Sequence, residues 1–122
     1  MSTIPYTQDR LGNGSIRVSW VNLVNGDIGV AFSLGTEYPI KTVEILGTFG
    51  AGGAVTVEGA NTQLSESTTF QTLSSDPSGA PFVANGSTLQ NILENTIQIR
   101  PNITSGDGTT LLTVRMTLAR RP

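Results

Sequence analysis

The segment that decides the fold is Thr96–Arg121, TIQIRPNITSGDGTTLLTVRMTLARR. From Leu111 to Leu118 apolar and polar side chains alternate, the period-2 pattern of a strand with one buried face. A similar alternation runs from Ile97 to Ile103, with Pro101 in the apolar row. Between the two runs lies Ser105-Gly106-Asp107-Gly108, which has the residue types of a hairpin loop. The segment therefore predicts two strands joined by a turn.

We expect these two strands to pair with each other in an antiparallel hairpin. Residues opposed in such a pair share a face, so the two apolar rows must be able to meet. A register that pairs Thr104 with Thr109 satisfies this condition. The apolar pairs it predicts are Ile97–Met116, Ile99–Val114 and Pro101–Leu112.

Length and composition favour one β-rich domain. A chain of 122 residues can bury roughly two-thirds of its unfolded surface. Only 37% of the residues are apolar and 13% charged, and 14 are glycine, which favours short strands and turns over helices. The net charge of −2 lacks the self-repulsion that is typical of disordered chains.

Several kinds of chemistry are excluded by the residues that the chain lacks. It contains no cysteine and no histidine, so it has no disulfide, no Cys or His metal ligand, no thiol nucleophile and no imidazole base. No apolar run reaches the ~20 residues that span a bilayer, and no secretory signal is visible, so we expect synthesis in a cytoplasm and no membrane contact. One lysine, six arginines and a pI of about 4.9 argue against binding to nucleic acid.

Two more hairpins are expected upstream. Ser15–Val24 and Ile28–Leu34 alternate as strands, and an odd-numbered loop centred on Gly26 would place Trp20 opposite Phe32 in the core.

Ile40–Phe49 and Val55–Glu58 form the other expected hairpin, in which a loop centred on Gly52 sets Phe49 opposite Val55. The glycines of this loop do not match a phosphate-binding loop, because no Gly-Lys-Ser/Thr follows them and a strand comes next.

The remaining middle of the chain predicts two short extended pieces, Thr68–Leu73 and Ala80–Ala84, and one helix over Ser87–Asn95. Ser87 and Gln90 have the spacing of a capping box, and the apolar face of that helix would consist of Leu89, Ile92 and Leu93. The predicted fold is all-β: an antiparallel β-sandwich or jelly roll of seven to eight short strands with one short helix.

We divide the chain into an extended N-terminal arm, residues 1–14, and a single β-sandwich domain, residues 15–122. The arm shows no periodicity and ends in the turn residues Gly12-Asn13-Gly14. It contains Ile4, Tyr6 and Arg10, residue types that anchor interfaces, and we predict that these three contact a partner. A frayed terminus is the alternative interpretation.

The acidic residues offer little for catalysis. Glu58, Glu66 and Asp107 lie near turns, but nothing in the sequence around them indicates a raised pKa, and aromatic platforms for a sugar are scarce. Calcium binding by Asp76 or Asp107 remains open, although the spacing of an EF-hand loop is absent. We predict that the protein is not an enzyme and needs no cofactor.

Three arginines close the chain, and two interpretations of them remain open. Arg115 faces outward on the last strand, and Arg120 and Arg121 follow it. They either guard a sheet edge against aggregation or contact an acidic neighbour. We include all three among the candidate partner-binding residues.

Two regions of the sequence resemble small head proteins of tailed bacteriophages. The C-terminal likeness is carried by Ile99-Arg100-Pro101, Ser105-Gly106-Asp107-Gly108-Thr109-Thr110, Leu112-Thr113-Val114 and Leu118-Ala119-Arg120-Arg121. The second likeness is carried by Val55-Thr56-Val57-Glu58-Gly59-Ala60-Asn61 and Phe70-Gln71-Thr72-Leu73. These segments lie within residues 55–73 and 99–121, and the first forty residues carry no resemblance.

The resemblance implies a capsid decoration, or cement, protein on the exterior of the virion. Its partner would be the major capsid protein, and it would self-associate, with a trimer favoured over a dimer. Two other classes stay open: a carbohydrate-binding jelly roll, which a solvent-facing Trp20 would favour, and a structural component of the tail or baseplate.

Overall fold

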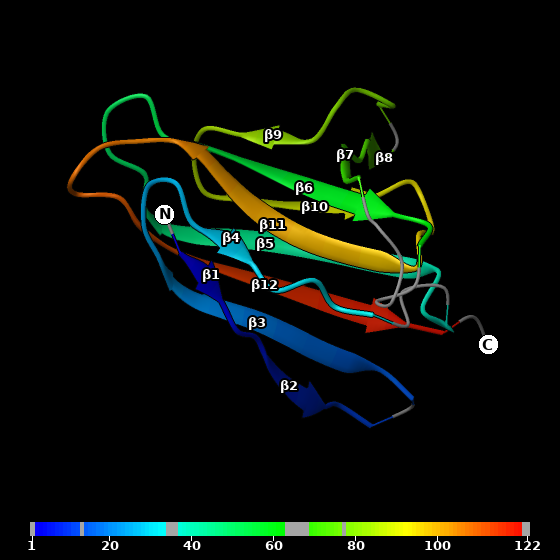
Figure 1. Cartoon of the computed structure of the whole chain (residues 1–122). Coiled ribbons are helices and arrows are strands. Elements are labelled where there is room, and N and C mark those ends of the chain that lie inside the picture. Colours follow the sequence, from blue (N-terminus) through cyan, green and yellow to red (C-terminus); the bar gives the residue numbers. More distant parts are fainter. Residues whose placement is uncertain (1, 13, 34–36, 63–68, 77, 121–122) are drawn as a thin grey trace.

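The computed structural model describes residues 2–12, 14–33, 37–62, 69–76 and 78–120. In this part of the chain twelve strands form two six-stranded sheets that stack face to face, and no α-helix is present (Figure 1). Sheet A has the order β1-β4-β11-β6-β7, with β9 also paired to β6, and sheet B has the order β2-β3-β12-β5-β10-β8. The predicted all-β sandwich is confirmed, although the described residues contain twelve strands in place of the seven to eight predicted, and five of the twelve are only two residues long.

Three long strands dominate sheet B and two dominate sheet A. The strands of sheet A are β1 (Thr3–Ile4), β4 (Ile28–Gly29), β6 (Ala54–Ala60), β7 (Gln71–Thr72), β9 (Val83–Ala84) and β11 (Gln98–Ser105). The strands of sheet B are β2 (Thr7–Arg10), β3 (Ile16–Leu23), β5 (Ile40–Thr48), β8 (Ser75–Asp76), β10 (Thr88–Ile92) and β12 (Leu111–Ala119). The pairs are antiparallel except β1 with β4, which is parallel.

The core lies between the sheets and is built from the rows that alternation predicts. On β12 the side chains of Leu112, Val114, Met116 and Leu118 are all buried, while their neighbours on the strand point outward. On β11 the row from Ile99 to Ile103 is buried in the same way. Both strands of the C-terminal segment, and the faces they bury, are therefore confirmed.

The pairing predicted for those two strands is wrong. β11 pairs with β6 and β4 in sheet A, whereas β12 pairs with β3 and β5 in sheet B. Residues 106–110 cross from one sheet to the other, so Ile99 and Val114 are not ladder partners. The two apolar rows belong to opposite sheets and face each other across the same core. The condition that the two rows must be able to meet is therefore satisfied by this arrangement as well as by a hairpin.

The two upstream hairpins are wrong for the same reason. β3 lies in sheet B and β4 in sheet A, so Trp20 pairs with Val114, and Phe32 forms a bridge with Ile99. β5 lies in sheet B and β6 in sheet A, so Phe49 and Val55 are not partners either. Leu34, the last residue of the expected strand Ile28–Leu34, lies outside the described residues.

Two of the crossing loops are tied together by Asp107. One oxygen of its carboxylate accepts the Ala51 amide of the β5–β6 loop at 2.8 Å, and the other accepts the Thr109 hydroxyl at 2.6 Å and amide at 2.8 Å. The hydrogen bond from the Thr109 hydroxyl is the largest of the contributions that lower the pKa of Asp107. In the same cluster the Thr110 hydroxyl donates to the Phe49 carbonyl at 2.7 Å.

The predicted helix over Ser87–Asn95 is wrong, because most of that segment forms β10. This strand pairs with β5 on one side and β8 on the other, so the capping box of Ser87 and Gln90 does not form. Leu89 is 66% exposed, whereas Ile92 is buried, since alternate residues of a strand point to opposite faces. A helix of two turns is marginal by itself, and pairing with β5 supplies backbone partners instead.

The two short extended pieces predicted in the middle of the chain are confirmed in part. Of the extended piece Thr68–Leu73, Gln71 and Thr72 form β7, while Thr68 lies outside the described residues. The piece Ala80–Ala84 contains β9.

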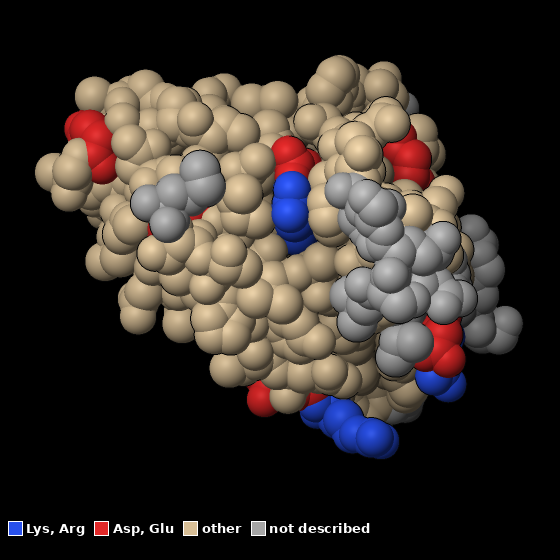
Figure 2. Space-filling model, in the orientation of Figure 1, with Lys and Arg blue, Asp and Glu red and all other residues tan. Residues whose placement is uncertain are grey.

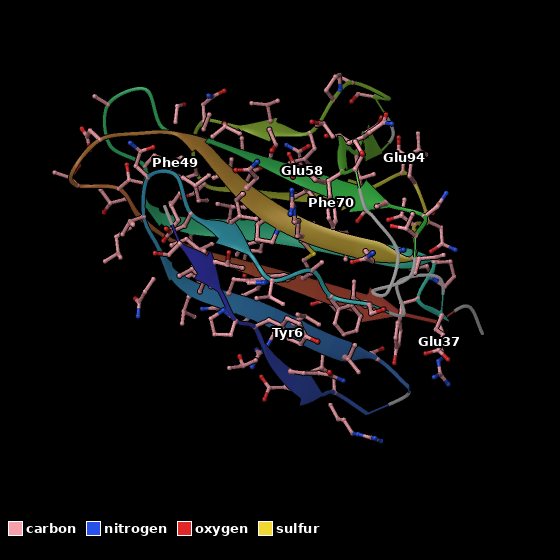
Figure 3. All side chains as sticks on the ribbon, viewed as in Figure 1. Tyr6, Glu37, Phe49, Glu58, Phe70 and Glu94 are labelled. Carbon is pink, nitrogen blue, oxygen red and sulfur yellow. The ribbon has the colours of Figure 1, made fainter. Side chains whose placement is uncertain are left out.

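The N-terminal segment forms an outer strand of each sheet. β1 pairs with β4, the chain then crosses to sheet B, and β2 pairs with β3 in a hairpin that opposes Arg10 to Ile16. Between β1 and β2 the Tyr6 ring points into the molecule (Figure 3) and contacts Trp20 and Phe32 edge to face. The segment predicted as an arm is thus extended and packs on its own domain.

Candidate functional site

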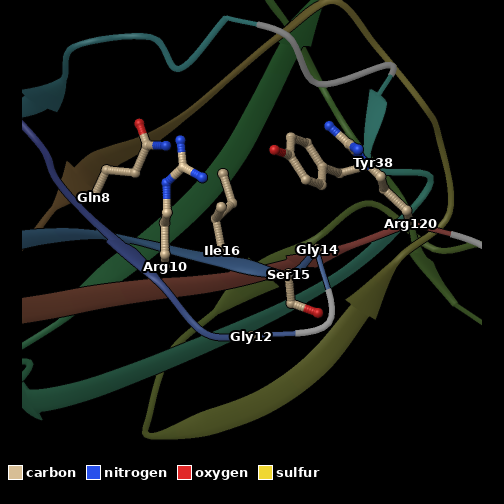
Figure 4. Close-up of a pocket in the computed structure, with 8 residues that line it drawn as sticks. All are labelled: Gln8, Arg10, Gly12, Gly14, Ser15, Ile16, Tyr38 and Arg120. Atoms are coloured by element: carbon tan, nitrogen blue, oxygen red, sulfur yellow. The ribbon is translucent and has the colours of Figure 1, made fainter.

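A surface pocket of about 250 Å³ lies beside the end of β2, the start of β3 and the residue that follows β12 (Figure 4). It brings together two of the predicted partner-binding residues, Arg10 from β2 and Arg120 from the residue after β12. The residues that line it are Gln8, Arg10, Gly12, Gly14, Ser15, Ile16, Tyr38 and Arg120.

The register of sheet B explains why the two arginines are near each other. Ile16 on β3 is opposed by Arg10 on one side and by Leu118 on the other. Opposed residues share a face, so Arg10 occupies an inward-facing position, and Arg120 continues the inward row of Leu118. Two rows that are apolar in the middle of the sandwich therefore end in arginines at its rim.

Tyr38 and Ile16 supply the apolar part of the pocket. Both side chains are buried, and the Cζ atom of Arg120 lies 5.4 Å from the centroid of the Tyr38 ring, within the range of a cation–π contact. Figure 4 shows the hydroxyl of Tyr38 directed toward the side of the pocket where Arg10 lies. The result is a small recess with an apolar floor and guanidinium groups at its edge.

Arg10 and Arg120 differ from the other described arginines because they form no ion pair with a described acidic residue. The ion pairs of the described residues are Arg17–Asp9 at 3.1 Å, Arg100–Glu58 at 3.0 Å and Arg115–Glu44 at 3.7 Å. Neither Arg10 nor Arg120 has an acidic partner within this part of the chain, and no Asp or Glu lines the pocket. Two uncompensated positive charges therefore face one recess.

The other predicted partner-binding residues lie elsewhere. Ile4 and Tyr6 pack against the core from the N-terminal segment. Arg115 lies on the outer face of sheet B opposite Glu44. Arg121 lies outside the described residues.

Six residues that line the pocket were not predicted as site residues: Gln8, Gly12, Gly14, Ser15, Ile16 and Tyr38. The sequence does indicate an inward-facing position for Arg120, because this residue continues the alternation of buried residues that ends at Leu118 on β12. Nothing in the sequence around Tyr38 marks it as part of the pocket.

A second pocket has a volume of about 340 Å³, and Glu94 is the only acidic residue among the described residues that line it. Burial favours a raised pKa for Glu94, but hydrogen bonds of 2.7 Å from both the amide and the hydroxyl of Ser74 outweigh it and lower the pKa. Glu94 is therefore held as an anion. This is the opposite of what a catalytic acid requires.

The acidic residues considered for catalysis or calcium have other partners or lie outside the description. Glu58 accepts hydrogen bonds from Arg100 at 3.0 Å and Asn102 at 3.1 Å, next to Phe70 (Figure 3). Asp107 joins the two crossing loops. Glu66 and the side chain of Asp76 lie outside the described residues. Within residues 2–120, gaps excepted, no three acidic side chains converge on a point where a metal ion could bind.

Trp20, whose exposure would have favoured a carbohydrate-binding surface, is fully buried. Its indole nitrogen donates to the Val30 carbonyl at 3.0 Å, and its ring contacts Tyr6. Trp20 is a core residue, as the sequence predicted.

The face of the molecule in Figure 2 carries few charged side chains.

Lys41 is a buried basic side chain that has no acidic partner in the described part of the chain. It is 1% exposed, and its Nζ donates to the Asn95 side-chain oxygen at 2.7 Å. Burial lowers its pKa to about 8.

Comparison with solved structures found a similar fold. No known family matches the chain, and no curated protein does so by sequence. Among solved structures the fold is similar to the crystal structure of the SPBc2 prophage-derived protein YomS, with a TM-score of 0.60 and 12% sequence identity. The superposition covers 90% of this chain and 98% of that one. This likeness concerns the fold alone. In the described part of the chain no helix is long and apolar enough to cross a membrane.

Proposed function

We propose that the protein is a non-enzymatic structural component of a phage virion, a decoration protein that binds the major capsid protein on the outside of the assembled shell. The observation that carries the proposal is the pocket in which Arg10 and Arg120 lack acidic partners. Unneutralised surface arginines favour contact with an acidic protein surface. The prophage origin of the structural neighbour and the likeness of the C-terminal segment to phage head proteins add support.

Binding is sufficient for this function. A protein that binds the assembled shell and not its separated subunits stabilises the shell by mass action, by ~4 kcal/mol at a thousandfold excess over Kd. Self-association, for which a trimer is the preferred hypothesis, would multiply the contacts of each bound unit and raise its avidity.

The proposal is tested by co-sedimentation with three kinds of particle: expanded capsids, unexpanded shells and isolated tails. We expect saturable binding to expanded capsids and weaker binding to unexpanded shells. Binding to tails alone would transfer the protein to the tail or baseplate class. Saturable binding to glycans, with no binding to any particle, would support the carbohydrate-binding class.

A further inference from the structure

We infer that the pocket formed by Arg10, Ile16, Tyr38 and Arg120 is a binding site for an acidic side chain, Asp or Glu, from an extended segment of a protein partner. The inference rests on the proposed function for the identity of that partner, the capsid shell. The chemistry of the ligand follows from the pocket itself.

The described residues that line the pocket offer hydrogen-bond donors and positive charge, and none of them is acidic. Besides the two arginines it is lined by the Gln8 amide and the hydroxyls of Ser15 and Tyr38. None of these three side chains has a hydrogen-bond partner among the described residues. A carboxylate would accept from several of them at once, and a planar guanidinium can donate to it through two nitrogens.

The floor of the pocket fits the aliphatic part of an acidic side chain. Ile16 and Tyr38 are buried and apolar, so the methylene groups of Glu or Asp can pack on them while the carboxylate reaches the rim. The volume of about 250 Å³ is below the range of ~300–1,000 Å³ that is typical of small-molecule and cofactor sites. One or two side chains fit this space better than a nucleotide does.

The position of the pocket favours a protein segment over a free anion. It opens beside β2, whose four residues are all exposed and which pairs with β3 alone. The free edge of an outer strand can pair with an extended segment of another chain, and alternate side chains of that segment would then point toward the pocket. The acidic pI of about 4.9 disfavours a polyphosphate partner such as nucleic acid.

The first test compares variants in the capsid co-sedimentation assay. Replacing both arginines, R10A/R120A, should weaken binding to expanded capsids by about tenfold, since each exposed charge pair contributes a few-fold in affinity. The matched control Arg17→Ala removes an exposed arginine that already has an acidic partner, and we expect a change below about threefold. R10K/R120K should show an intermediate loss, because lysine keeps the charge and loses the paired donors. Equal binding by wild type and R10A/R120A would overturn the inference.

The second test needs no capsid and separates the inference from the proposed function. The arginine Nε–H signals of the labelled protein are followed by NMR during titration with N-acetyl-glutamate methylamide at millimolar concentrations. The uncharged control is N-acetyl-glutamine methylamide, and inorganic phosphate is the competing anion. Shifts of Arg10 and Arg120 with the glutamate probe alone support the inference even if no virion particle is bound. No shift, or a larger response to phosphate, overturns it.

Discussion

Replacing Tyr6 with alanine should destabilise the whole domain, because this side chain joins the N-terminal segment to the core. Its ring lies 5.9 Å from the Trp20 ring at an interplanar angle of 68°, and 5.5 Å from the Phe32 ring at 77°. Trp20 belongs to sheet B, and Phe32 bridges to sheet A through Ile99. Tyr6 therefore closes the core between the two sheets at the point where the chain changes sheet.

The magnitude follows from the two ring contacts and the partial burial of the side chain. An edge-to-face aromatic pair contributes about 0.5–1.5 kcal/mol beyond burial, so losing two such pairs costs about 1–3 kcal/mol. Removing a half-buried ring adds about 1 kcal/mol of lost apolar burial. We expect the free energy of unfolding to fall by about 2–4 kcal/mol. For a chain of 122 residues this lowers Tm by about 8–16 °C.

The assay is urea unfolding followed by the fluorescence of Trp20, the single tryptophan, which is fully buried in the folded state. The control is Tyr6→Phe, which keeps both ring contacts and removes a hydroxyl that has no hydrogen-bond partner among the described residues. It should stay within about 0.5 kcal/mol of the wild type. If Tyr6→Ala also stays within that margin at an unchanged m-value, the N-terminal segment is not part of the fold and the reasoning is refuted. Deleting residues 1–14 would remove β1, β2 and Tyr6 together, so the point variants give the cleaner answer.

Three further predictions concern packing, titration and the loops. Gly29→Ala would place a Cβ atom 2.6 Å from the Trp20 ring and should cost about 1–3 kcal/mol in chemical denaturation, whereas Gly86→Ala, which meets nothing within 4 Å, should change little. Because burial lowers the pKa of Lys41 from 10.5 to about 8, the unfolded chain binds more protons than the folded chain between those values. The free energy of unfolding should therefore rise with pH across that window, by at most about 3 kcal/mol, and Lys41→Met should abolish the rise in urea titrations at a series of pH values. Asp107→Ala should speed hydrogen exchange of the loop amides that its carboxylate accepts. Because the pKa of Asp107 is lowered, its carboxylate stays ionised at pH values below the ordinary Asp pKa. In the wild type the protection of these amides should therefore be lost only as the pH falls through the lowered pKa.

Alternation in the sequence predicted the strands and their buried faces, and it could not predict which strands pair. The row from Leu112 to Leu118 is inward whether its partner is β11 or β3, because period-2 patterns specify a face and not a neighbour. Each loop that contains glycines between two such rows was interpreted as a hairpin. In the structure the three loops so interpreted, residues 24–27, 49–53 and 106–110, each cross from one sheet to the other.

The error over Ser87–Asn95 has a different physical origin. Leu89, Ile92 and Leu93 have helical spacing, and the sequence contains no information on the free edge of β5 that this segment covers. Backbone pairing with β5 and β8 outweighs a weak local preference for a helix, and Leu89 and Leu93 remain exposed as a consequence.

The candidate site was predicted in part, since Arg10 and Arg120 were named but their proximity was not. That proximity requires β2 to pair with β3, and β3 with β12, which are contacts between the two ends of the sequence. Tyr38 joins them from the residues before β5, and no local pattern indicates that placement.

This topology couples the pocket to completion of the fold. The ladders that join β12 to β3 and to β5 connect segments that are distant in sequence, so this part of sheet B forms only when the C-terminal strand is in place. The pocket takes Arg10 from the outer strand of sheet B and Arg120 from the end of its central strand, so a chain that lacks either end would lack the site. The pocket is thus a property of the complete sandwich, which is why a loss of binding in R10A/R120A must be measured in variants whose unfolding midpoints match the wild type.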